Sequence, residues 1–333
     1  MTSTRSYSSR SAALDGLAPQ ADRDLFTALE PRVGALHLRQ RLGLESDHQA
    51  RIFGRGRNFF HLENWYSVHG LIRHGLRLAG LHGRGRRNAL RIKVQENPLT
   101  VPGLPAAFEG YTILQVSDPH LDMSPGLPNA VAELVRGLQY DICVLTGDFR
   151  ARTFGPYRPA VEALARVRAY LRDPVYAVLG NHDTIRMVPD LESQGIRVLL
   201  NESVALRRGG ASLYLAGVDD PHYYKADNLE KAAQHVPDEG PSLLLAHSPE
   251  IYRHVAHAGF DAMLCGHTHG GQICLPGGLP LMCNARCPRA MCAGPWSYHD
   301  MIGYTSRGAG VSVVDVRLNC PGEVTLHRLR GRD

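Results

Sequence analysis

The chain has 333 residues, of which 44% are hydrophobic and 21% are charged, a composition typical of a globular protein. We expect no transmembrane helix, because no run of about 18 apolar residues occurs, and no secretory signal, because Met1-Thr2-Ser3-Thr4-Arg5 has no apolar core. The seven cysteines are an odd number, which argues against a fully paired disulfide framework and favours a reducing, cytoplasmic location.

The net charge of +5 is concentrated in one segment. Residues 51–93 contain ten Lys or Arg and one acidic residue, Glu63, so the rest of the chain is net negative. Arginines alternate there with apolar and aromatic residues such as Phe59, Trp65 and Leu71. This pattern is typical of a helix on an anionic membrane surface, and an arginine-rich helix packed on its own domain explains it equally well. We expect no nucleic-acid binding, because no recognition motif accompanies the charge.

The pattern predicts two parts that meet at about residue 98. Helical spacing of apolar residues over 22–44, together with the basic segment, predicts a helical, basic N-terminal extension over 1–98 that ends in a linker at 98–105. Residues 99–333 then form the main domain. We expect the first 20 residues, which are rich in serine, to fray.

Apolar runs alternate with helical patterns in the main domain. The strand-like runs are residues 112–116, 142–145, 175–179, 213–216, 243–246 and 262–265. Helical patterns lie at about 131–138 and 161–171. This alternation predicts an α/β protein whose sheet is buried on both faces.

Five of these runs are followed directly by side chains that can bind metal ions. In chain order they are Asp118-Pro119-His120, Gly147-Asp148, Gly180-Asn181-His182-Asp183, His247 and Gly266-His267-Thr268-His269. A Gly-Asp pair alone is usually a turn, and a single histidine is more often a core residue. Because ligands bind outside the carboxyl ends of strands in open α/β sheets, the recurrence indicates one shared site.

In order and spacing, the five blocks resemble the calcineurin-like metallophosphoesterase superfamily, over roughly residues 111–320. The resemblance implies a four-layer α-β-β-α sandwich of two mixed sheets with a dinuclear metal centre. It implies one metal on Asp118, His120, Asp148 and His269, and a second on Asp148, Asn181, His247 and His267. A donor set of imidazole, carboxylate and amide without thiolate suits two divalent ions of Mn, Fe or Zn in an open site.

The same resemblance implies a mechanism. A hydroxide that bridges the two metals attacks phosphorus while the metals bind the phosphate oxygens. His182 is expected to protonate or stabilise the developing oxyanion, and Asp183 to orient His182 or a neighbouring group.

Substrate contacts are predicted less directly. Arg150 is not part of the superfamily pattern, and a phosphate clamp and a surface arginine are equally good interpretations. Asn181, in the Gly180-Asn181-His182-Asp183 block, is also predicted to contact the substrate. The long loop after His269 carries Arg286 and leads to Arg307, and we interpret it as a lid or a substrate wall.

Two further features of this loop have plain interpretations. Gly270-Gly271-Gln272 is expected to let the backbone approach the metals. The spacing Cys283-x3-Cys287-x4-Cys292 suggests a zinc site, but it is atypical, and free or buried thiols are favoured.

These patterns together predict a metal-dependent hydrolase of a phosphoester or pyrophosphate bond. It is most similar to the subgroup with a basic or hydrophobic N-terminal extension. The resemblance to this subgroup implies a lipid-linked or nucleotide-linked substrate, as for hydrolases of UDP-diacylglucosamine, and a position in the cytoplasm or at the inner face of the membrane. One alternative is a soluble protein phosphatase or nucleotide phosphodiesterase. The other is a non-catalytic scaffold with the same fold.

Overall fold

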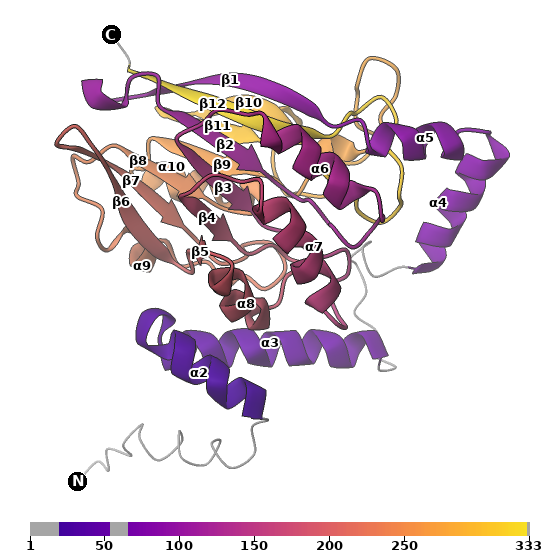
Figure 1. The fold of residues 1–333 in the computed structure, drawn as a ribbon, viewed down its shortest axis with the longest axis horizontal. Helices are drawn as coiled ribbons and strands as arrows, with labels where there is room; N and C mark the ends of the chain where they lie inside the picture. The colour runs from indigo at the N-terminus through magenta and orange to yellow at the C-terminus, as the bar shows by residue number, and fades with distance from the viewer. Residues whose placement is uncertain (1–19, 54–65, 332–333) are drawn as a thin grey trace.

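The computed structural model describes residues 20–53 and 66–331, and Figure 1 shows the arrangement of their elements. Residues 1–19, which we expected to fray, lie outside the described residues, as do Phe59 and Trp65 of the basic segment. None of the described helices is long and apolar enough to cross a membrane.

Two six-stranded mixed sheets form the centre of the molecule. The first contains, in spatial order, β1 Lys93–Val101, β12 Glu323–Gly331, β2 Thr112–Val116, β3 Ile142–Thr146, β4 Val175–Val178 and β5 Ile196–Val198. The second contains β10 Gly294–Tyr298, β11 Met301–Thr305, β9 Ala262–Cys265, β8 Ser242–Leu245, β7 Ala211–Gly217 and β6 Glu202–Arg208. Side chains such as Ile113, Val144 and Leu215 fill the core between the sheets.

Helices cover the outer face of each sheet and complete four layers. The main-domain helices are α6 Leu127–Arg136, α7 Arg158–Arg168, α8 Val188–Ser193, α9 Leu229–Ala233 and α10 Tyr252–His257. Short 3-10 turns lie at Ala106–Phe108, Ile185–Met187, Pro249–Ile251, His269–Gly271 and Arg289–Met291. The first three helices pack on the first sheet, and α9 and α10 pack on the second. The predicted four-layer α-β-β-α sandwich is confirmed.

Parallel pairing brings the polar loops to one edge of the molecule. Strands β2, β3, β4 and β5 are parallel neighbours, with Val116 beside Leu145 and Thr146 beside Val178. Strands β7, β8, β9 and β11 are likewise parallel. Both β2 and β3 are apolar runs that are almost entirely buried, as expected for strands covered on both faces.

The N-terminal extension is helical, but the expected helix over 22–44 is two helices. α2 Gln20–Val33 and α3 Ala35–Phe53 are separated by Gly34, whose φ of 85° lies in the left-handed region that glycine adopts readily. Figure 1 shows α2 and α3 beneath α7 and α8. Leu25, Leu29 and Leu38 join the core of the first sheet.

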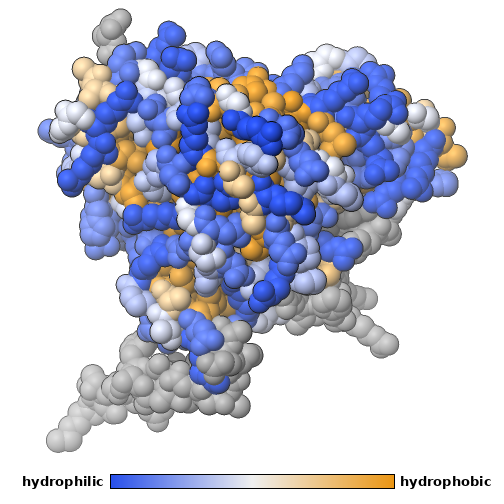
Figure 2. Space-filling view, in the orientation of Figure 1, coloured by the Kyte–Doolittle hydropathy of each residue, from blue (hydrophilic) through white to orange (hydrophobic). Residues whose placement is uncertain are grey.

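The basic segment forms α4 Tyr66–Leu78 and α5 His82–Ala89 at one end of the molecule. In Figure 2, apolar side chains are visible at the right-hand edge, where α4 and α5 meet. The linker predicted at 98–105 is wrong for its first residues, because β1 extends to Val101 and pairs in parallel with β12. The domain division at residue 98 remains a prediction, and this position lies inside a strand.

Candidate metal centre

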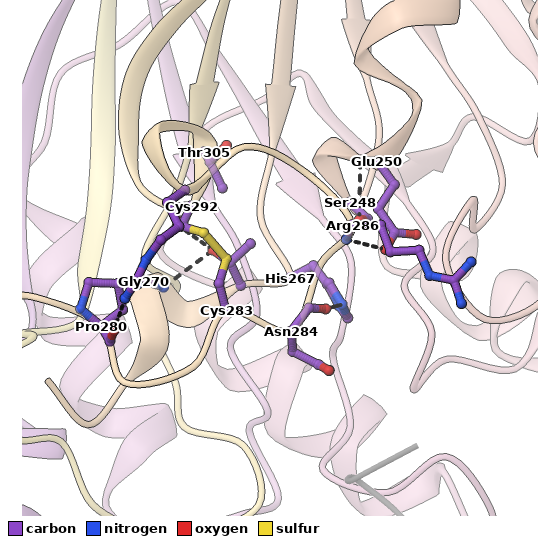
Figure 3. The surroundings of a disulfide bond; sticks show 12 residues. Ser248, Glu250, His267, Gly270, Pro280, Cys283, Asn284, Arg286, Cys292 and Thr305 are labelled. Atoms are coloured by element: carbon purple, nitrogen blue, oxygen red, sulfur yellow. Dashed lines mark hydrogen bonds between the residues drawn. A yellow bond between two sulfur atoms is a disulfide. The ribbon is translucent and has the colours of Figure 1, made fainter. Parts of the chain in front are cut away.

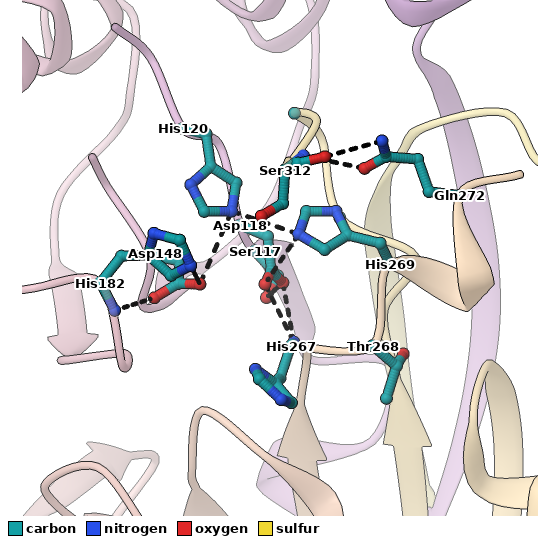
Figure 4. Close-up of polar contacts among 12 residues, drawn as sticks. Ser117, Asp118, His120, Asp148, His182, His267, Thr268, His269, Gln272 and Ser312 are labelled. Atoms are coloured by element: carbon teal, nitrogen blue, oxygen red, sulfur yellow. Dashed lines mark hydrogen bonds and ion pairs between the residues drawn. The ribbon is translucent and has the colours of Figure 1, made fainter. Parts of the chain in front are cut away.

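The five polar loops meet at one point beyond the strand ends, as Figure 4 shows for several of them. All seven predicted ligands are buried there: Asp118, His120, Asp148, Asn181, His247, His267 and His269. The ligand atoms of the six carboxylate and imidazole residues among them fall in groups of three within 4.8 Å, and these groups could hold metal ions. The described residues therefore bring together every ligand that the motifs predicted.

One group of donors lies between β2 and β9. His120 Nε2 is 3.2 Å from His269 Nε2, and His269 Nε2 is 3.6 Å from Asp118 Oδ1. The two rings are stacked, with centroids 5.1 Å apart. Two imidazole nitrogens and a carboxylate oxygen that converge in this way suit one divalent cation.

A second group lies between β4 and β8. His247 Nε2 and His267 Nδ1 are each 2.9 Å from Asn181 Oδ1, and they are 3.2 Å from each other. Two ring nitrogens that face one another repel when both present lone pairs, and a cation between them removes this repulsion. The donor chemistry therefore fits a metal in this second group as well.

Asp148 lies between the two groups. Its Oδ2 is 3.6 Å from His120 Nε2 and 3.3 Å from His247 Nε2. Its other oxygen, Oδ1, accepts a hydrogen bond of 2.8 Å from the backbone N–H of His182. One carboxylate oxygen is thus held by the protein and the other is shared, as a ligand between two cations requires.

Backbone carbonyls set the orientation of three of the four imidazoles. His120 Nδ1 donates to the carbonyl of Arg150 at 2.7 Å, and His247 Nδ1 donates to that of Thr146 at 2.8 Å. His267 uses its opposite nitrogen, Nε2, to donate to the carbonyl of Asn284 at 2.7 Å. In each ring the remaining nitrogen faces the centre, where a bound cation would take the place of any proton on it.

His269 differs from the other three. Its Nδ1 lies 3.3 Å from the guanidinium of Arg317, which is fully buried and also donates to the carbonyls of Arg307 and Gly310. Sequence analysis missed Arg317, because an isolated arginine near the chain end carries no motif. Its hydrogen bonds tie the segment around Gly308 to the last histidine loop.

Burial and charge prepare these groups to accept cations. Burial lowers the pKa of His120 to about 3 and holds the pKa values of His267 and His269 well below the ordinary range, which keeps these rings neutral. Burial raises the pKa of Asp148 to about 7. Burial alone lowers the pKa of His247, but the carboxylates of Asp148 and Asp118 outweigh it and hold that pKa well above its usual value. The buried carboxylates thus attract positive charge into the centre.

The backbone at the centre adopts unusual conformations. Five of the ligand residues have positive φ although none is glycine: Asp118, His120, Asp148, His267 and His269. Such conformations cost free energy and are concentrated at functional sites. Glycines allow the close approach: a Cβ on Gly180 would lie 2.2 Å from Asp148 Oδ1, and one on Gly266 would lie 2.2 Å from Asp118 Oδ2.

Asp183 positions Asp148 through the backbone. Its carboxylate accepts hydrogen bonds from the N–H groups of Asp148 at 2.7 Å, Phe149 at 2.9 Å and Gly180 at 2.9 Å. We expected Asp183 to orient His182 or a neighbouring group, and its carboxylate contacts the loop of Asp148. It is completely buried, so it acts as a positioning residue.

The N-terminal extension braces the same loop, which no motif predicted. Arg41 of α3 is fully buried, donates to the carbonyl of Asp183 at 3.1 Å and forms an ion pair with Asp219 at 3.1 Å. Glu45, one turn later, accepts from the N–H of Ile185 at 2.8 Å. Because both side chains contact the segment that follows His182, α3 supports the loop that carries Asn181 and His182.

His182 stands beside Asp148, and its ring nitrogen lies within 4.8 Å of ligand atoms of Asp148 and His120, although the motifs assign it to neither metal. Its Nδ1 donates to the carbonyl of Ala151 at 3.0 Å, and its Nε2 lies 3.9 Å from Asp148 Oδ2. Its side chain lines two cavities. This position agrees with the predicted catalytic role, which remains a prediction.

The three predicted substrate arginines have different surroundings. Arg150 is only 2% exposed, so the surface interpretation is wrong, and its guanidinium donates to the backbone carbonyls of His182, Thr153 and Gly155. Arg307 is paired with buried Glu323 at 2.6 Å. Arg286 is exposed. Their substrate contacts, and that of Asn181, remain predictions.

The structure corrects the prediction for the cysteine loop. Cys283 and Cys292 form a disulfide (Figure 3), where we favoured free thiols. The sulfur of Cys287 lies within 4.8 Å of both. The sequence carried no signal for this pairing, because it depends on how the loop folds back. The bond closes the loop that supplies the carbonyl of Asn284 to His267. Since disulfides are rare in reducing compartments, the odd cysteine count no longer favours a cytoplasmic location.

A cavity of about 440 Å³ opens from the metal centre. Asp148, His182, His267 and His269 lie at its inner end. Its walls are largely apolar and come from three segments: Ile72, Gly75 and Leu76 of α4, Ile273, Leu281 and Met282 of the loop after β9, and Val313 and Val314. Sequence analysis did not predict that α4 lines the site.

Comparison with known proteins gives consistent results. The family model described as calcineurin-like phosphoesterase matches residues 111–271. The "Uncharacterized metallophosphoesterase YkoQ" of Bacillus subtilis (strain 168) is 32% identical over 260 residues, 74% of this chain and 93% of that protein. "Phosphodiesterase YaeI" of Escherichia coli (strain K12) is 28% identical over 66% of this chain and 82% of that protein. A "Transmembrane protein with metallophosphoesterase domain" of Danio rerio is 28% identical over 70% of this chain and 56% of that protein.

Proposed function

The chain belongs to the calcineurin-like metallophosphoesterase family and is a phosphoester hydrolase, and from this premise we propose that two divalent cations at its centre serve the hydrolysis of a lipid-linked phosphoester or phosphoanhydride. The non-catalytic scaffold is thereby set aside. The soluble nucleotide or protein phosphatase remains the alternative, and the experiment below separates it from the lipid-linked substrate.

The observation that carries the proposal is the apolar cavity that ends at the metal ligands. A phosphate bound at Asp148 and His182 has its substituent facing Leu76, Ile273 and Val314. A volume of about 440 Å³ accommodates a substantial alkyl group. Each buried methylene contributes about 0.8 kcal/mol, so this wall favours a chain over a sugar or a peptide.

The side chains of the centre have separate tasks in this proposal. Cations bound there supply Lewis-acid stabilisation of the phosphoryl oxygens and lower the pKa of water. Asp148 would contribute to holding both cations, because its Oδ2 lies between His120 and His247, while its Oδ1 is fixed by the His182 backbone. His182 Nε2, with the ring fixed by the Ala151 carbonyl, would face the leaving oxygen. Burial lowers the pKa of this ring, so Nε2 would first take a proton from the attacking water and then pass that proton to the leaving oxygen.

Exposed apolar side chains support a membrane surface as the source of substrate. Leu71 is 71% exposed and Leu78 is 78% exposed on α4, and Leu279, Leu281 and Met282 are each more than half exposed on the loop after β9. Both segments also line the apolar cavity. Sedimentation with anionic vesicles tests this surface, and binding that is unchanged in a double variant Leu71→Gln, Leu279→Gln would remove it. A cytoplasmic location remains a prediction.

The substrate proposal is tested with p-nitrophenyl alkyl phosphates from methyl to decyl, assayed below their micellar concentrations with Mn²⁺. We expect kcat/KM to rise about two- to fourfold per methylene until the cavity is filled. Leu76→Gln should reduce the rise of kcat/KM with alkyl chain length. Leu36→Gln, an exposed leucine on α3, is the matched control and should keep the slope. A flat series in the unmodified protein supports the soluble phosphatase instead.

A further inference from the structure

We propose that the centre serves a second, cationic cavity as well, and that the substrate carries a second anionic group on the far side of the scissile phosphorus. The inference rests on the proposed function, since it assigns the other half of the same substrate. It makes the protein a hydrolase of diesters or anhydrides with an anionic head group, rather than a monoesterase.

The second cavity has a volume of about 550 Å³. His182 and Val313 line both cavities, so the two cavities meet beside His182, while the predicted ligands Asp148, His267 and His269 line the first cavity. Residues 150–154 form much of its floor, and Gly70 and Arg73 of α4 contribute to its wall. A phosphorus atom bound beside His182 therefore has room for a substituent on each side, whereas a monoester would leave one cavity unused.

The charge of this cavity is opposite to that of a phosphate. Arg73, Arg150 and Arg152 line it together with a single carboxylate, Asp122. Asp122 accepts the N–H of Ala151 at 2.7 Å, so part of its charge is already compensated. The net charge of the residues that line the second cavity is therefore positive, while the first cavity is lined mainly by apolar side chains. A substrate that fills both is amphiphilic, with an apolar chain on one side and an anion on the other.

Arg73 has a buried nitrogen that is free to bind an anionic group of the substrate. Its Nε is buried, and within the described part of the chain it has no hydrogen-bond partner. A buried donor without an acceptor costs free energy, and an anionic oxygen in the cavity would satisfy it. Arg150 differs, because its guanidinium already donates to three carbonyls. We therefore assign head-group selection to Arg73, with Arg150 supplying charge and shape.

The wall between the cavities is held in an unusual conformation. Val313 has a φ of 66°, and the N–H of Val314 donates across it to Ser312 at 2.6 Å. A β-branched residue in this region is a genuine outlier. The amide of Gln272 clamps the turn, since its Nε2 donates to the carbonyls of Ser312 at 2.8 Å and Val314 at 2.9 Å and its Oε1 accepts from Ser312 at 2.8 Å (Figure 4). These hydrogen bonds therefore hold the wall between the cavities in one conformation.

The test uses three dioctanoyl lipids with the same apolar half: phosphatidylglycerol phosphate, phosphatidylglycerol and phosphatidate. We expect kcat/KM to be about tenfold or more higher for the first than for the second, because a charge-assisted hydrogen bond is gained. The products should retain the terminal phosphate on the glycerol head group. Faster cleavage of phosphatidate, or release of inorganic phosphate from the first lipid, identifies a monoesterase and overturns the inference.

Substitution of Arg73 locates the effect. Arg73→Gln should raise KM for phosphatidylglycerol phosphate severalfold more than for phosphatidylglycerol, and so reduce the preference to about twofold. Arg77→Gln removes the same charge from an exposed position on the same helix that lines neither cavity, and it should keep the preference. A preference that survives Arg73→Gln contradicts the assignment. If the alkyl series is steep but head-group charge has no effect, only this inference fails.

Discussion

The metal centre and the cavity walls around it are built in contrasting ways. The centre comes from five short loops that each follow a buried strand, and all seven ligands carry carboxylate, imidazole or amide groups. The walls come from α4, from the loop after β9 and from Ser312 to Val314, and they consist mainly of ordinary apolar residues. The centre is thus specified by chemistry, and the walls are specified by packing.

The contrast separates two properties of an enzyme. Changes at the centre should lower turnover of every substrate, because every substrate needs the cations. Changes in the walls should alter which substrates are accepted and leave cation binding intact. The following predictions test whether the two regions can be separated in this way.

The largest effect is expected at Asp148. Asp148→Asn removes the negative charge of the oxygen that lies between the two groups of donors, so both cations should bind weakly. We expect activity on all substrates to fall by more than about 100-fold. Loss of a residue that only hydrogen-bonds a metal ligand costs up to about 100-fold, and Asp148 is proposed to be a ligand itself. Elemental analysis of the purified variant is the decisive measurement, and loss of one cation alone would show that Asp148 is not shared.

His182 should give a smaller loss of a different kind. Because each proposed cation has its donors without His182, although His182 lies within 4.8 Å of the ligand atoms of His120 and Asp148, His182→Ala should retain both cations and lower kcat by about 100-fold on alkyl and aryl substrates alike. His254→Ala, an exposed histidine on α10, provides the control for loss of an imidazole. Normal turnover in His182→Ala would mean that the proton comes from elsewhere.

Gln272 is the most direct test of the walls. Gln272→Ala removes three hydrogen bonds to the turn around Val313 and should leave cation content unchanged. We expect KM for octyl substrates to rise about three- to tenfold while methyl substrates change by less than about twofold, since only the longer chain reaches the loosened wall. An equal loss for both substrates would place Gln272 with the centre.

Much of the fold was predictable because the sequence of a buried parallel strand is a continuous run of apolar residues. β2 and β9 match their predicted ranges at every residue. The strand-helix alternation predicted an α/β protein, and the family resemblance implied the two sheets. The candidate ligands could be picked out of the sequence because few side chains bind cations and because each of these sits next to a strand end. These are local properties of the sequence.

The remainder depends on contacts between distant segments. Arg41 meets Asp183 and Asp219 across more than 140 positions, and no local pattern marks it as a buried residue. The same holds for the disulfide between Cys283 and Cys292, for Arg317 and for α4, whose arginines fitted a membrane surface and packing on its own domain equally well. Sequence patterns describe what a segment can form, whereas docking decides what it touches.

The last described strand has a consequence for how the molecule is made. β12 lies between β1 and β2 in the first sheet, so Glu323–Gly331 separates two strands that are close neighbours in the sequence. Residues 93–101 therefore cannot pair with β12 until more than 200 later residues have been synthesised. During that interval their backbone N–H and C=O groups form an open strand edge, which is where a nascent chain is most exposed to mispairing and most dependent on chaperones.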